Sequence, residues 1–251
     1  MITTSQENQI KIIQLNRKKA NALNYDLIKS ISEHLNKIKS DESVKGIILT
    51  GHEGMFSAGL DIVELYDKDR EYMKNFWFLF SNLLLQIYSF PKLIFTAISG
   101  HSPAGGTVIS IMTDYRIMAK GKYVIGLNEV AVGLTMPISI GKVFQSLLGD
   151  RIAEKMTLLG QLVDPLKAYQ IGLIDEVVSS HDLLTRTKEE MNSWLKLPYN
   201  KQINSKLSLR SDIINIMKEN IKSNSDNFID SWFSSECRDT LSKIINKISK
   251  K

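Results

Sequence analysis

One carboxylate and two glycine-rich turns are the residues of this chain best suited to chemistry. Glu129 follows Ile125-Gly-Leu-Asn128, and further apolar residues follow it. A carboxylate in so apolar a segment loses its water, which raises its pKa and strengthens it as a base. The glycine-rich turns lie upstream, in residues 51–61 and 99–106. Together these residues predict a site that moves a proton beside a stabilised negative charge.

Each glycine-rich turn follows the pattern of a buried strand and precedes the pattern of a helix. Glycine lets the backbone turn sharply and approach a ligand. Free N–H groups at the start of the following helix attract negative charge. Two such turns side by side present two N–H groups to one oxygen, an arrangement called an oxyanion hole. Either turn alone is a weak signal and is better explained as a plain strand-to-helix connection, so the prediction depends on their combination with Glu129.

A serine hydrolase is the main rival interpretation of the second turn. Gly100-His-Ser-Pro-Ala104 imitates the nucleophile elbow of α/β-hydrolases, which takes one oxyanion donor from the N–H after the serine. Here that residue is Pro103, which has no N–H. Ala104 also replaces the closing glycine of the elbow. Ser102 is therefore not expected to be a nucleophile.

Other common chemistries lack their motifs. Neither Gly-Lys pair is followed by serine or threonine, so there is no phosphate-binding P-loop. The four histidines show no metal-ligand spacing, and no GxGxxG dinucleotide motif is present. We therefore expect neither a metal nor a resident cofactor.

The bulk composition is that of a globular protein. With 251 residues, 43% of them hydrophobic, the chain can bury a full core as one large domain or as one domain with an appendage. No apolar run has the ~18 residues of a membrane span, and the N-terminus has no signal-peptide pattern. The single cysteine, Cys237, excludes an internal disulfide. These features favour the cytoplasm, without a membrane partner.

Alternating strand and helix patterns up to about residue 130 predict an α/β core with parallel strand pairing. Apolar runs predict strands at 10–15, 45–50, 93–98, 114–119, 123–126 and 173–177. Helical spacing predicts helices at 27–38, 69–89, 104–112, 138–148, 150–159, 165–171 and 181–196, and two longer ones after Pro198. We therefore expect a domain over residues 1–197 and a helical region over 198–251.

The C-terminal region is basic, with ten of the 32 Lys and Arg residues and six of the 27 Asp and Glu residues after position 200. A solvated, lysine-rich helix face explains this charge, although a basic tail also suits nucleic acid, a membrane or an anionic ligand. Aromatic residues are not interleaved with the basic ones as a nucleic-acid platform requires. The amphipathic helices must pack on the core or on another subunit.

Taken together, these segments resemble the crotonase, or enoyl-CoA hydratase/isomerase, superfamily, and most of all its mitochondrial-type Δ3,Δ2-enoyl-CoA isomerases. The resemblance runs in order through roughly residues 10–180. Its most specific stretches are Phe56-Ser-Ala-Gly-Leu-Asp61, Ala97-Ile-Ser-Gly100, Pro103-Ala-Gly-Gly106, Asp114-Tyr-Arg-Ile117 and Ile125-Gly-Leu-Asn-Glu129. The resemblance implies the crotonase (ClpP-like) spiral of ββα units with a helical C-terminal region that makes trimers or hexamers and covers the CoA site.

The resemblance also implies an acyl-CoA thioester as substrate and assigns roles to residues. The thioester oxygen is expected between the backbone N–H groups of Leu60 and Gly105. The CoA is expected to run past Lys18, Ala20, Ser57, Ala58, Leu60, Asp61 and Ile62. Hydratases of the superfamily carry a second catalytic glutamate where this chain has Val108, whereas isomerases keep only the carboxylate that corresponds to Glu129.

A lone base predicts an isomerase of fatty acid β-oxidation. Glu129 is expected to move the C2 proton of a 3-enoyl-CoA to C4 through a dienolate, giving the 2-trans product. Two alternatives stay open at this point. One is another crotonase-fold acyl-CoA enzyme, such as a weak hydratase, a pathway-specific isomerase or a decarboxylase. The other is a non-catalytic member that binds CoA or nucleic acid.

Overall fold

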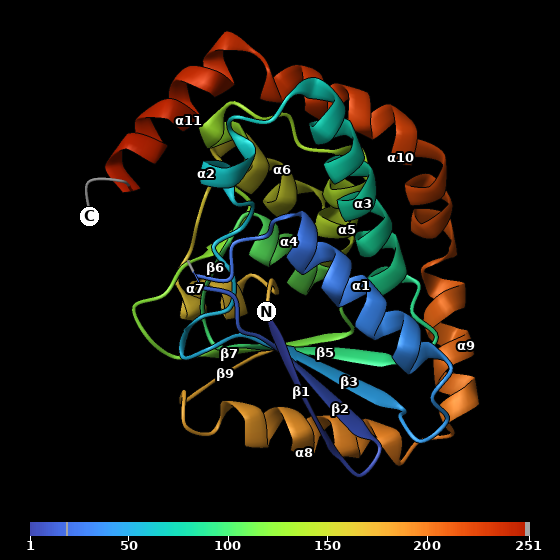
Figure 1. Ribbon diagram of the computed structural model, residues 1–251. Coiled ribbons are helices and arrows are strands. Elements are labelled where there is room, and N and C mark those ends of the chain that lie inside the picture. Colours follow the sequence, from blue (N-terminus) through green and yellow to red (C-terminus); the bar gives the residue numbers. More distant parts are fainter. Residues whose placement is uncertain (19, 249–251) are drawn as a thin grey trace.

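A six-stranded sheet forms the centre of the molecule (Figure 1). The computed structural model describes residues 1–18 and 20–248, except for the side chains of residues 222–227. In spatial order the strands are β1 (Ile2–Glu7), β2 (Ile10–Leu15), β3 (Gly46–Thr50), β5 (Leu93–Ile98), β7 (Tyr115–Ala119) and β9 (Glu176–Val178). From β2 onward every neighbouring pair is parallel, which confirms the predicted pairing.

The edge strand β1 pairs antiparallel with β2 and has no counterpart among the predicted strands. Its side chains are exposed apart from Ile2, which is half-buried. An edge strand with so little burial lacks the apolar run that marks β3 and β5, where every residue is buried.

A second, small sheet consists of β4 (Gly54–Met55), β6 (Gly100–Pro103) and β8 (Ile125–Gly126). Each of the pairs β3–β4, β5–β6 and β7–β8 gives its first strand to the large sheet and its second to the small one. Helical structure follows each pair. The predicted spiral of ββα units is thereby confirmed, and it brings the two glycine-rich turns and the segment before Glu129 together at the small sheet.

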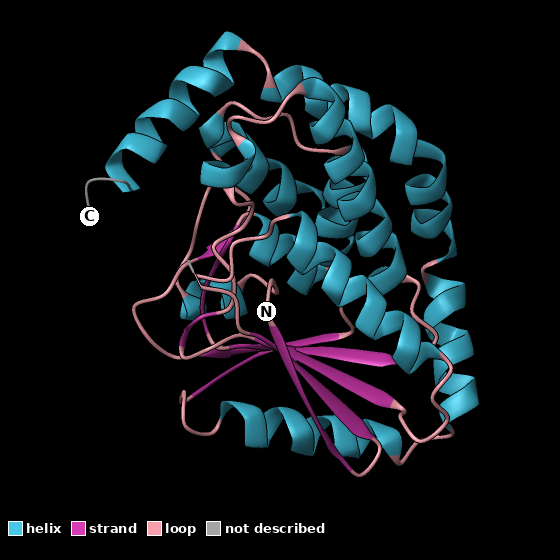
Figure 2. Cartoon of the chain, viewed as in Figure 1, coloured by secondary structure: helices cyan, strands magenta, loops and turns pink. Residues whose placement is uncertain are grey.

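Helices cover both faces of the large sheet. They are α1 (Tyr25–Lys39), α2 (Ile62–Leu65), α3 (Arg70–Tyr88), α4 (Gly105–Ile111), α5 (Ile138–Leu148), α6 (Asp150–Leu159), α7 (Pro165–Gln170), α8 (Leu183–Leu195), α9 (Tyr199–Leu209), α10 (Ser211–Trp232) and α11 (Ser235–Ile248), with a 3-10 turn η1 (Val130–Val132). Figure 2 shows α8 across one face, while α1, α3 and α4 lie on the other. The described residues after Pro198, up to position 248, contain three helices rather than the two expected, because α9 ends at Leu209 and α10 starts anew at Ser211.

Two apolar cores lie on the two sides of the sheet. The smaller packs α8 residues such as Met191 against Phe95 and other sheet residues. The larger one joins α1, α3, α4 and α5 and includes Met217, Phe228 and Trp232 of α10. The C-terminal helices thus share the main core with residues 1–197. The division at residue 197 stays a prediction.

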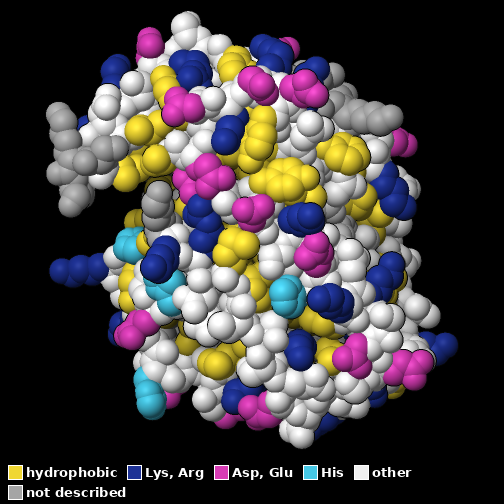
Figure 3. Space-filling view, viewed as in Figure 1, with side chains coloured by type: hydrophobic (Ala, Val, Ile, Leu, Met, Phe, Trp, Pro, Cys, Tyr) yellow, Lys and Arg dark blue, Asp and Glu magenta, His cyan; other side chains and the backbone are white. Residues whose placement is uncertain are grey.

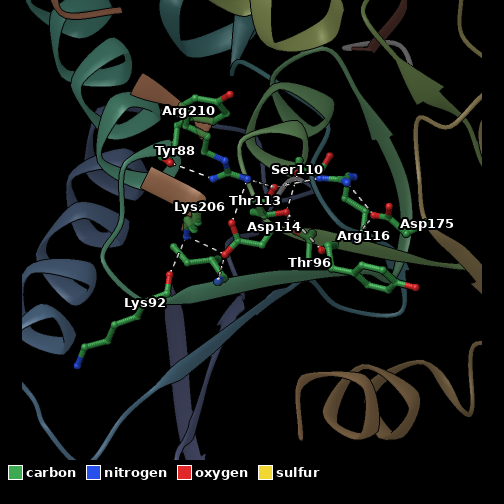
Figure 4. A network of polar contacts seen from close by, with 12 residues as sticks. Tyr88, Lys92, Thr96, Ser110, Thr113, Asp114, Arg116, Asp175, Lys206 and Arg210 are labelled. Atoms are coloured by element: carbon green, nitrogen blue, oxygen red, sulfur yellow. Dashed lines mark hydrogen bonds and ion pairs between the residues drawn. The ribbon is translucent and has the colours of Figure 1, made fainter. Parts of the chain in front are cut away.

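A buried ionic network fastens the start of the C-terminal helices to the sheet (Figure 4). The carboxylate of Asp114 lies 2.8 Å from Lys206 Nζ and 3.0 Å from Arg210 Nη2, and it accepts the backbone N–H of Ile94. Arg210 Nη1 also donates to the carbonyl of Tyr88 at the end of α3. These contacts fix the position of Arg210, the residue directly before α10, beside the end of α3. Within the part of the chain that the structure describes, no helix is long and apolar enough to cross a membrane.

Candidate active site

A cavity of about 680 Å³ lies between the two glycine-rich turns and the C-terminal helices. Figure 3 shows apolar side chains along the underside of α11, where the surface is notched. The lining of the cavity includes residues from both turns, from α3, from the 128–140 segment, and from α10 and α11. The lining residues from the first loop, the two glycine-rich turns, α2, α4 and the segment of Glu129 are Ala20, Ala22, Ala58, Leu60, Asp61, Ile62, Val63, Pro103, Ala104, Gly105, Val108, Asn128 and Glu129.

Glu129 is a buried carboxylate at this cavity. Its side chain is 9% exposed, and its Oε2 has no hydrogen-bond partner among the described residues. Burial raises the pKa of Glu129 to about 7, against an ordinary value of 4.5. Its position is fixed by its own backbone, because the carbonyl of Glu129 accepts the N–H groups of Val132 and Leu134. The expected desolvated carboxylate is therefore present, and its role as the base stays a prediction.

The two glycine-rich turns touch each other. A Cβ added to Gly59 would lie 3.0 Å from the Cβ of Ala104 and 3.1 Å from the nitrogen of Gly105. A Cβ on Gly105 would in turn lie 3.2 Å from the Cα of Gly59. Both positions therefore need glycine for the close approach. Gly59 also has a φ of +87°, which side chains rarely adopt.

The two expected oxyanion donors stand on these turns. No protein acceptor takes the N–H of Leu60 or of Gly105 in the described part of the chain. Their neighbours are held firmly, since the carbonyl of Gly59 accepts the N–H of Leu23 and the N–H of Asp61 donates to the carbonyl of Leu23. Ala104 adopts a left-handed φ of 49° just before Gly105. Leu60, Gly105 and Glu129 thus line one cavity, while their catalytic roles stay predictions.

Thr107 connects the second turn to the segment that carries Glu129. Its hydroxyl donates to the carbonyl of Ser102 and accepts the N–H of Gly126 at 2.8 Å. The N–H of Ala104 donates to the carbonyl of Gly126. A buried threonine inside a helical pattern gives no signal of such a role in the sequence, so Thr107 was not among the expected site residues.

Asn21 connects the first loop to the first turn. The side chain is fully buried, and its amide donates to the carbonyls of Leu15 and Phe56. The hydroxyl of Ser57 donates to the carbonyl of Asn21 and accepts the N–H of Gly59. Ser57 therefore lies behind the turn as a support, and it is not part of the cavity lining.

The other residues expected to meet the CoA fall into two groups. The cavity lining includes Ala20, Ala58, Leu60, Asp61 and Ile62. Lys18 is exposed and is not part of the lining. Lys19, within the same expected segment, lies outside the described residues. Contacts of all these residues with CoA stay predictions.

Glu129 and Asp61 are the two carboxylates among the described residues of the lining. Asp61 is committed elsewhere, because its Oδ2 lies 2.8 Å from Arg17 Nη2 and its Oδ1 accepts the N–H of Glu64 as the cap of α2. Val108 also lines the cavity and is 2% exposed. Glu129 is therefore the carboxylate of the lining that is left without an ion-pair partner.

The remainder of the lining is apolar and includes the aromatic residues Trp77, Phe80, Phe228 and Trp232. The helical pattern of residues 69–89 does not indicate that Trp77 and Phe80 line a site. Phe228 and Trp232 of α10 and Leu241 of α11 come from a region whose expected role was to cover the CoA site. A pattern along one helix cannot show which distant helix its apolar face will meet.

Known proteins are similar to this chain both in sequence and in fold. Residues 5–247 match the family described as enoyl-CoA hydratase/isomerase. The chain is 31% identical to enoyl-CoA delta isomerase 1, mitochondrial, of Mus musculus, over 87% of this chain and 77% of that one. It is 29% identical to short-chain-enoyl-CoA hydratase of Clostridium acetobutylicum, over 82% and 78% of the two chains.

Among solved structures, human mitochondrial delta3-delta2-enoyl-CoA isomerase superimposes with a TM-score of 0.96 at 25% identity, covering 99% of this chain and 98% of that one. This match confirms the crotonase fold that the motifs predicted. By its family match, its sequence relatives and its fold, the chain is a member of the enoyl-CoA hydratase/isomerase family of enzymes.

Proposed function

We propose that this protein is a Δ3,Δ2-enoyl-CoA isomerase of fatty acid β-oxidation. The observation that carries the proposal is Glu129 itself: a buried carboxylate with a pKa of about 7, and the one carboxylate in the described lining without an ion-pair partner. Val108 occupies the position where hydratases of the superfamily are expected to carry a second glutamate. The names of the mouse and human relatives support the same choice.

The reaction follows from one base and two N–H donors. The N–H groups of Leu60 and Gly105 hold the thioester oxygen. Glu129 takes the proton from C2, and the electron pair of that C–H bond moves into the enolate, whose charge rests on the thioester oxygen. The carboxyl then returns the proton to C4 while a double bond forms between C2 and C3. Each oxyanion donor is expected to contribute ~10²–10³ in rate.

Hydration needs a second acid–base group, which this site does not supply. Adding water to a 2-enoyl thioester requires a second acid–base group that holds the water over C3. A valine at position 108 neither accepts nor donates a proton. Positioned proton transfer is worth ~10²–10⁴ in rate, so the loss of one such group makes hydration slow.

Incubation with 3-cis- and 3-trans-hexenoyl-CoA tests the proposal, with the conjugated 2-enoyl thioester followed by its ultraviolet absorbance. The wild-type protein should form it, and Glu129→Gln should lose at least ~10²-fold in turnover while still binding CoA esters. Turnover of the variant within a few-fold of wild type would rule out the proton shuttle. Binding of CoA esters without any turnover by the wild type would favour the non-catalytic alternative.

A further inference from the structure

Arg17 lies behind the first glycine-rich turn and is not part of the cavity lining. Its side chain is 14% exposed, and its Nη2 atom contacts two carboxylates, Asp61 Oδ2 at 2.8 Å and Glu64 Oε2 at 2.9 Å. Its Nη1 atom makes a different contact and donates to the backbone carbonyl of Ala22 at 3.0 Å. The ion pairs use Nη2 alone, so the contact of Nη1 needs an explanation of its own.

The backbone of Arg17 is held as firmly as its side chain. Its N–H donates to Asn21 Oδ1 at 2.8 Å, and its carbonyl accepts the N–H of Asn21 at 3.2 Å. Asn21 is itself fully buried and adopts a left-handed φ of 51°. The guanidinium group is thus fixed at both ends, by its own backbone and by its carboxylate partners.

Two peptide groups connect this guanidinium group to the expected oxyanion donor Leu60. The first, between Ala22 and Leu23, accepts from Arg17 through its C=O and donates through its N–H to the carbonyl of Gly59 at 2.7 Å. The second, between Gly59 and Leu60, receives that bond at its C=O. Its own N–H is the one that no protein acceptor takes among the described residues. Arg17 therefore stands at one end of a hydrogen-bonded chain, and the N–H of Leu60 stands at the other.

The planar trans geometry of the peptide group gives this chain a direction. No described peptide bond is cis, and in a trans peptide group the C=O and N–H bonds point in opposite directions. The bond that the carbonyl of Gly59 accepts from Leu23 thus turns the N–H of Leu60 away from Leu23. Hydrogen bonds in a chain also polarise one another, which strengthens the last donor.

The other expected donor, Gly105, is supported by its own helix instead. The carbonyl of Ala104 belongs to the same peptide group as the N–H of Gly105, and it accepts the N–H of Val108 at 2.9 Å at the start of α4. A change at Arg17 should therefore weaken one oxyanion donor and leave the other as it is.

We propose that Arg17 is a positioning residue of the oxyanion hole, which acts through these two peptide groups to orient and polarise the N–H of Leu60 toward the thioester oxygen of the substrate. This inference rests on the proposed function for the identity of that oxygen. Two carboxylates face the one guanidinium group, so the cluster has no net positive charge. The effect therefore depends on the hydrogen bonds rather than on attraction by a distant cation.

The stretching frequency of the bound thioester carbonyl tests the inference. Hexanoyl-CoA with ¹³C at the thioester carbon cannot be isomerised, and isotope-edited infrared spectroscopy gives its carbonyl frequency free and bound. Hydrogen bonds to the oxygen lower this frequency, so binding to wild type should lower it. Binding to Arg17→Lys should lower it less, because lysine lacks the planar fork with which Arg17 contacts three partners at once. An equal shift in the two proteins would overturn the inference.

Arg186→Lys is the matched control. Arg186 also contacts two carboxylates, Glu176 Oε1 at 2.9 Å and Glu190 Oε2 at 2.6 Å, but it lies on α8 and outside the cavity lining. The carbonyl shift and kcat of this variant should equal those of wild type. Losses as large as those of Arg17→Lys would show that breaking any such pair has this effect, and would overturn the role of the peptide chain.

Kinetics should show the same loss as the enolate forms. In Arg17→Lys, kcat for 3-hexenoyl-CoA should fall by about tenfold, less than the ~10²–10³ expected for removing an oxyanion donor outright. KM should change little, since an interaction that strengthens in the transition state acts on kcat. A higher KM with an unchanged kcat would mean that Arg17 shapes only the binding of the ester, and would overturn the inference.

A backbone change tests the same chain if Arg17→Lys does not fold. An ester in place of the amide between Ala22 and Leu23 removes the N–H that Gly59 accepts and leaves the side chain of Arg17 intact. The carbonyl shift of bound hexanoyl-CoA should again be smaller than in wild type. An unchanged shift would overturn the inference.

The infrared measurement separates this inference from the proposed function, because it needs no turnover. A shift in wild type that is smaller in Arg17→Lys supports the inference even if no 3-enoyl-CoA is isomerised, a result that would overturn only the isomerase. Equal shifts together with normal turnover of 3-hexenoyl-CoA would overturn only the inference. No shift in wild type would overturn the oxyanion hole, and the role of Arg17 with it.

Discussion

At the scale of single residues, Glu129 must be charged before it can take a proton from carbon, and burial works against that charge. With one face against apolar neighbours and no partner for Oε2, its pKa stands at about 7. A base with a pKa near the working pH combines an adequate charged fraction with a strong affinity for the proton. In the proposed mechanism, burial thus contributes to catalysis at this residue rather than only opposing the charge.

This pKa predicts the pH dependence of the reaction. Because the active form is the carboxylate, kcat/KM for 3-hexenoyl-CoA should rise about tenfold per pH unit well below pH 7 and level off above it. Initial rates between pH 5 and pH 9 give the profile. A flat profile down to pH 5 would mean that the carboxyl keeps an ordinary pKa near 4.5, and the desolvated-base argument would not hold.

At this scale, the sequence reveals those site residues that have a local signature. Glu129 stands out because a carboxylate is rare in an apolar segment, and Gly59 and Gly105 because repeated glycines mark sharp turns. Thr107 has no such signature, since its two hydrogen bonds join residues brought together only by the small sheet.

At the scale of elements, the position of α10 decides the shape of the apolar cavity. The helix starts beside the Asp114 network and brings Phe228 and Trp232 against α3 four to six turns later. The sequence predicted amphipathic C-terminal helices but not this path, because the pairing of α10 with α3 is a long-range contact. Periodicity shows which face of a helix is apolar and leaves its partner open.

Asp114 should therefore be important for stability. Asp114→Ala leaves Lys206 and Arg210 buried without their carboxylate, and breaking a buried pair in this way typically costs about 3–5 kcal/mol of unfolding free energy. Urea unfolding measures the loss. The control is Arg151→Ala, which breaks the Arg151–Glu154 pair, whose side chains are 84% and 57% exposed, and should change stability very little. Equal effects of the two changes would show that the network does not fasten the helices.

At the scale of the whole molecule, the spiral brings three distant segments to one cavity. The α/β class and the parallel pairing were predictable, because strand and helix patterns alternate clearly along the chain. The spiral of ββα units was implied by the resemblance to the crotonase superfamily rather than by the patterns. The edge strand β1 was not predictable, since it has little buried surface. The division of the C-terminal region into three helices was not predictable either, since α10 begins after a single-residue break at Arg210. Such features depend on tertiary contacts rather than on local pattern.

A trimer or hexamer remains the expected assembly. The C-terminal helices bury apolar residues within their own chain, whereas α6 and α7 leave Leu158, Leu159, Leu166 and Tyr169 more than half exposed. Exposed apolar groups of this size favour a contact between subunits. Light scattering should give three or six times the mass of the chain, and Leu158→Lys with Leu159→Lys should lower it. A wild-type monomer at micromolar concentration would contradict the expected assembly.

The most direct test of the single-carboxylate site compares two reactions of one enzyme preparation at saturating substrate. Isomerisation of 3-hexenoyl-CoA should exceed hydration of crotonyl-CoA by at least ~10², because one acid–base group needed for hydration is missing. Val108→Glu should raise hydration only modestly, since burying a new carboxylate is costly and the cavity is not shaped to order the water. Hydration by the wild type as fast as isomerisation, or faster, would show that another side chain supplies the second acid and that the protein is a hydratase.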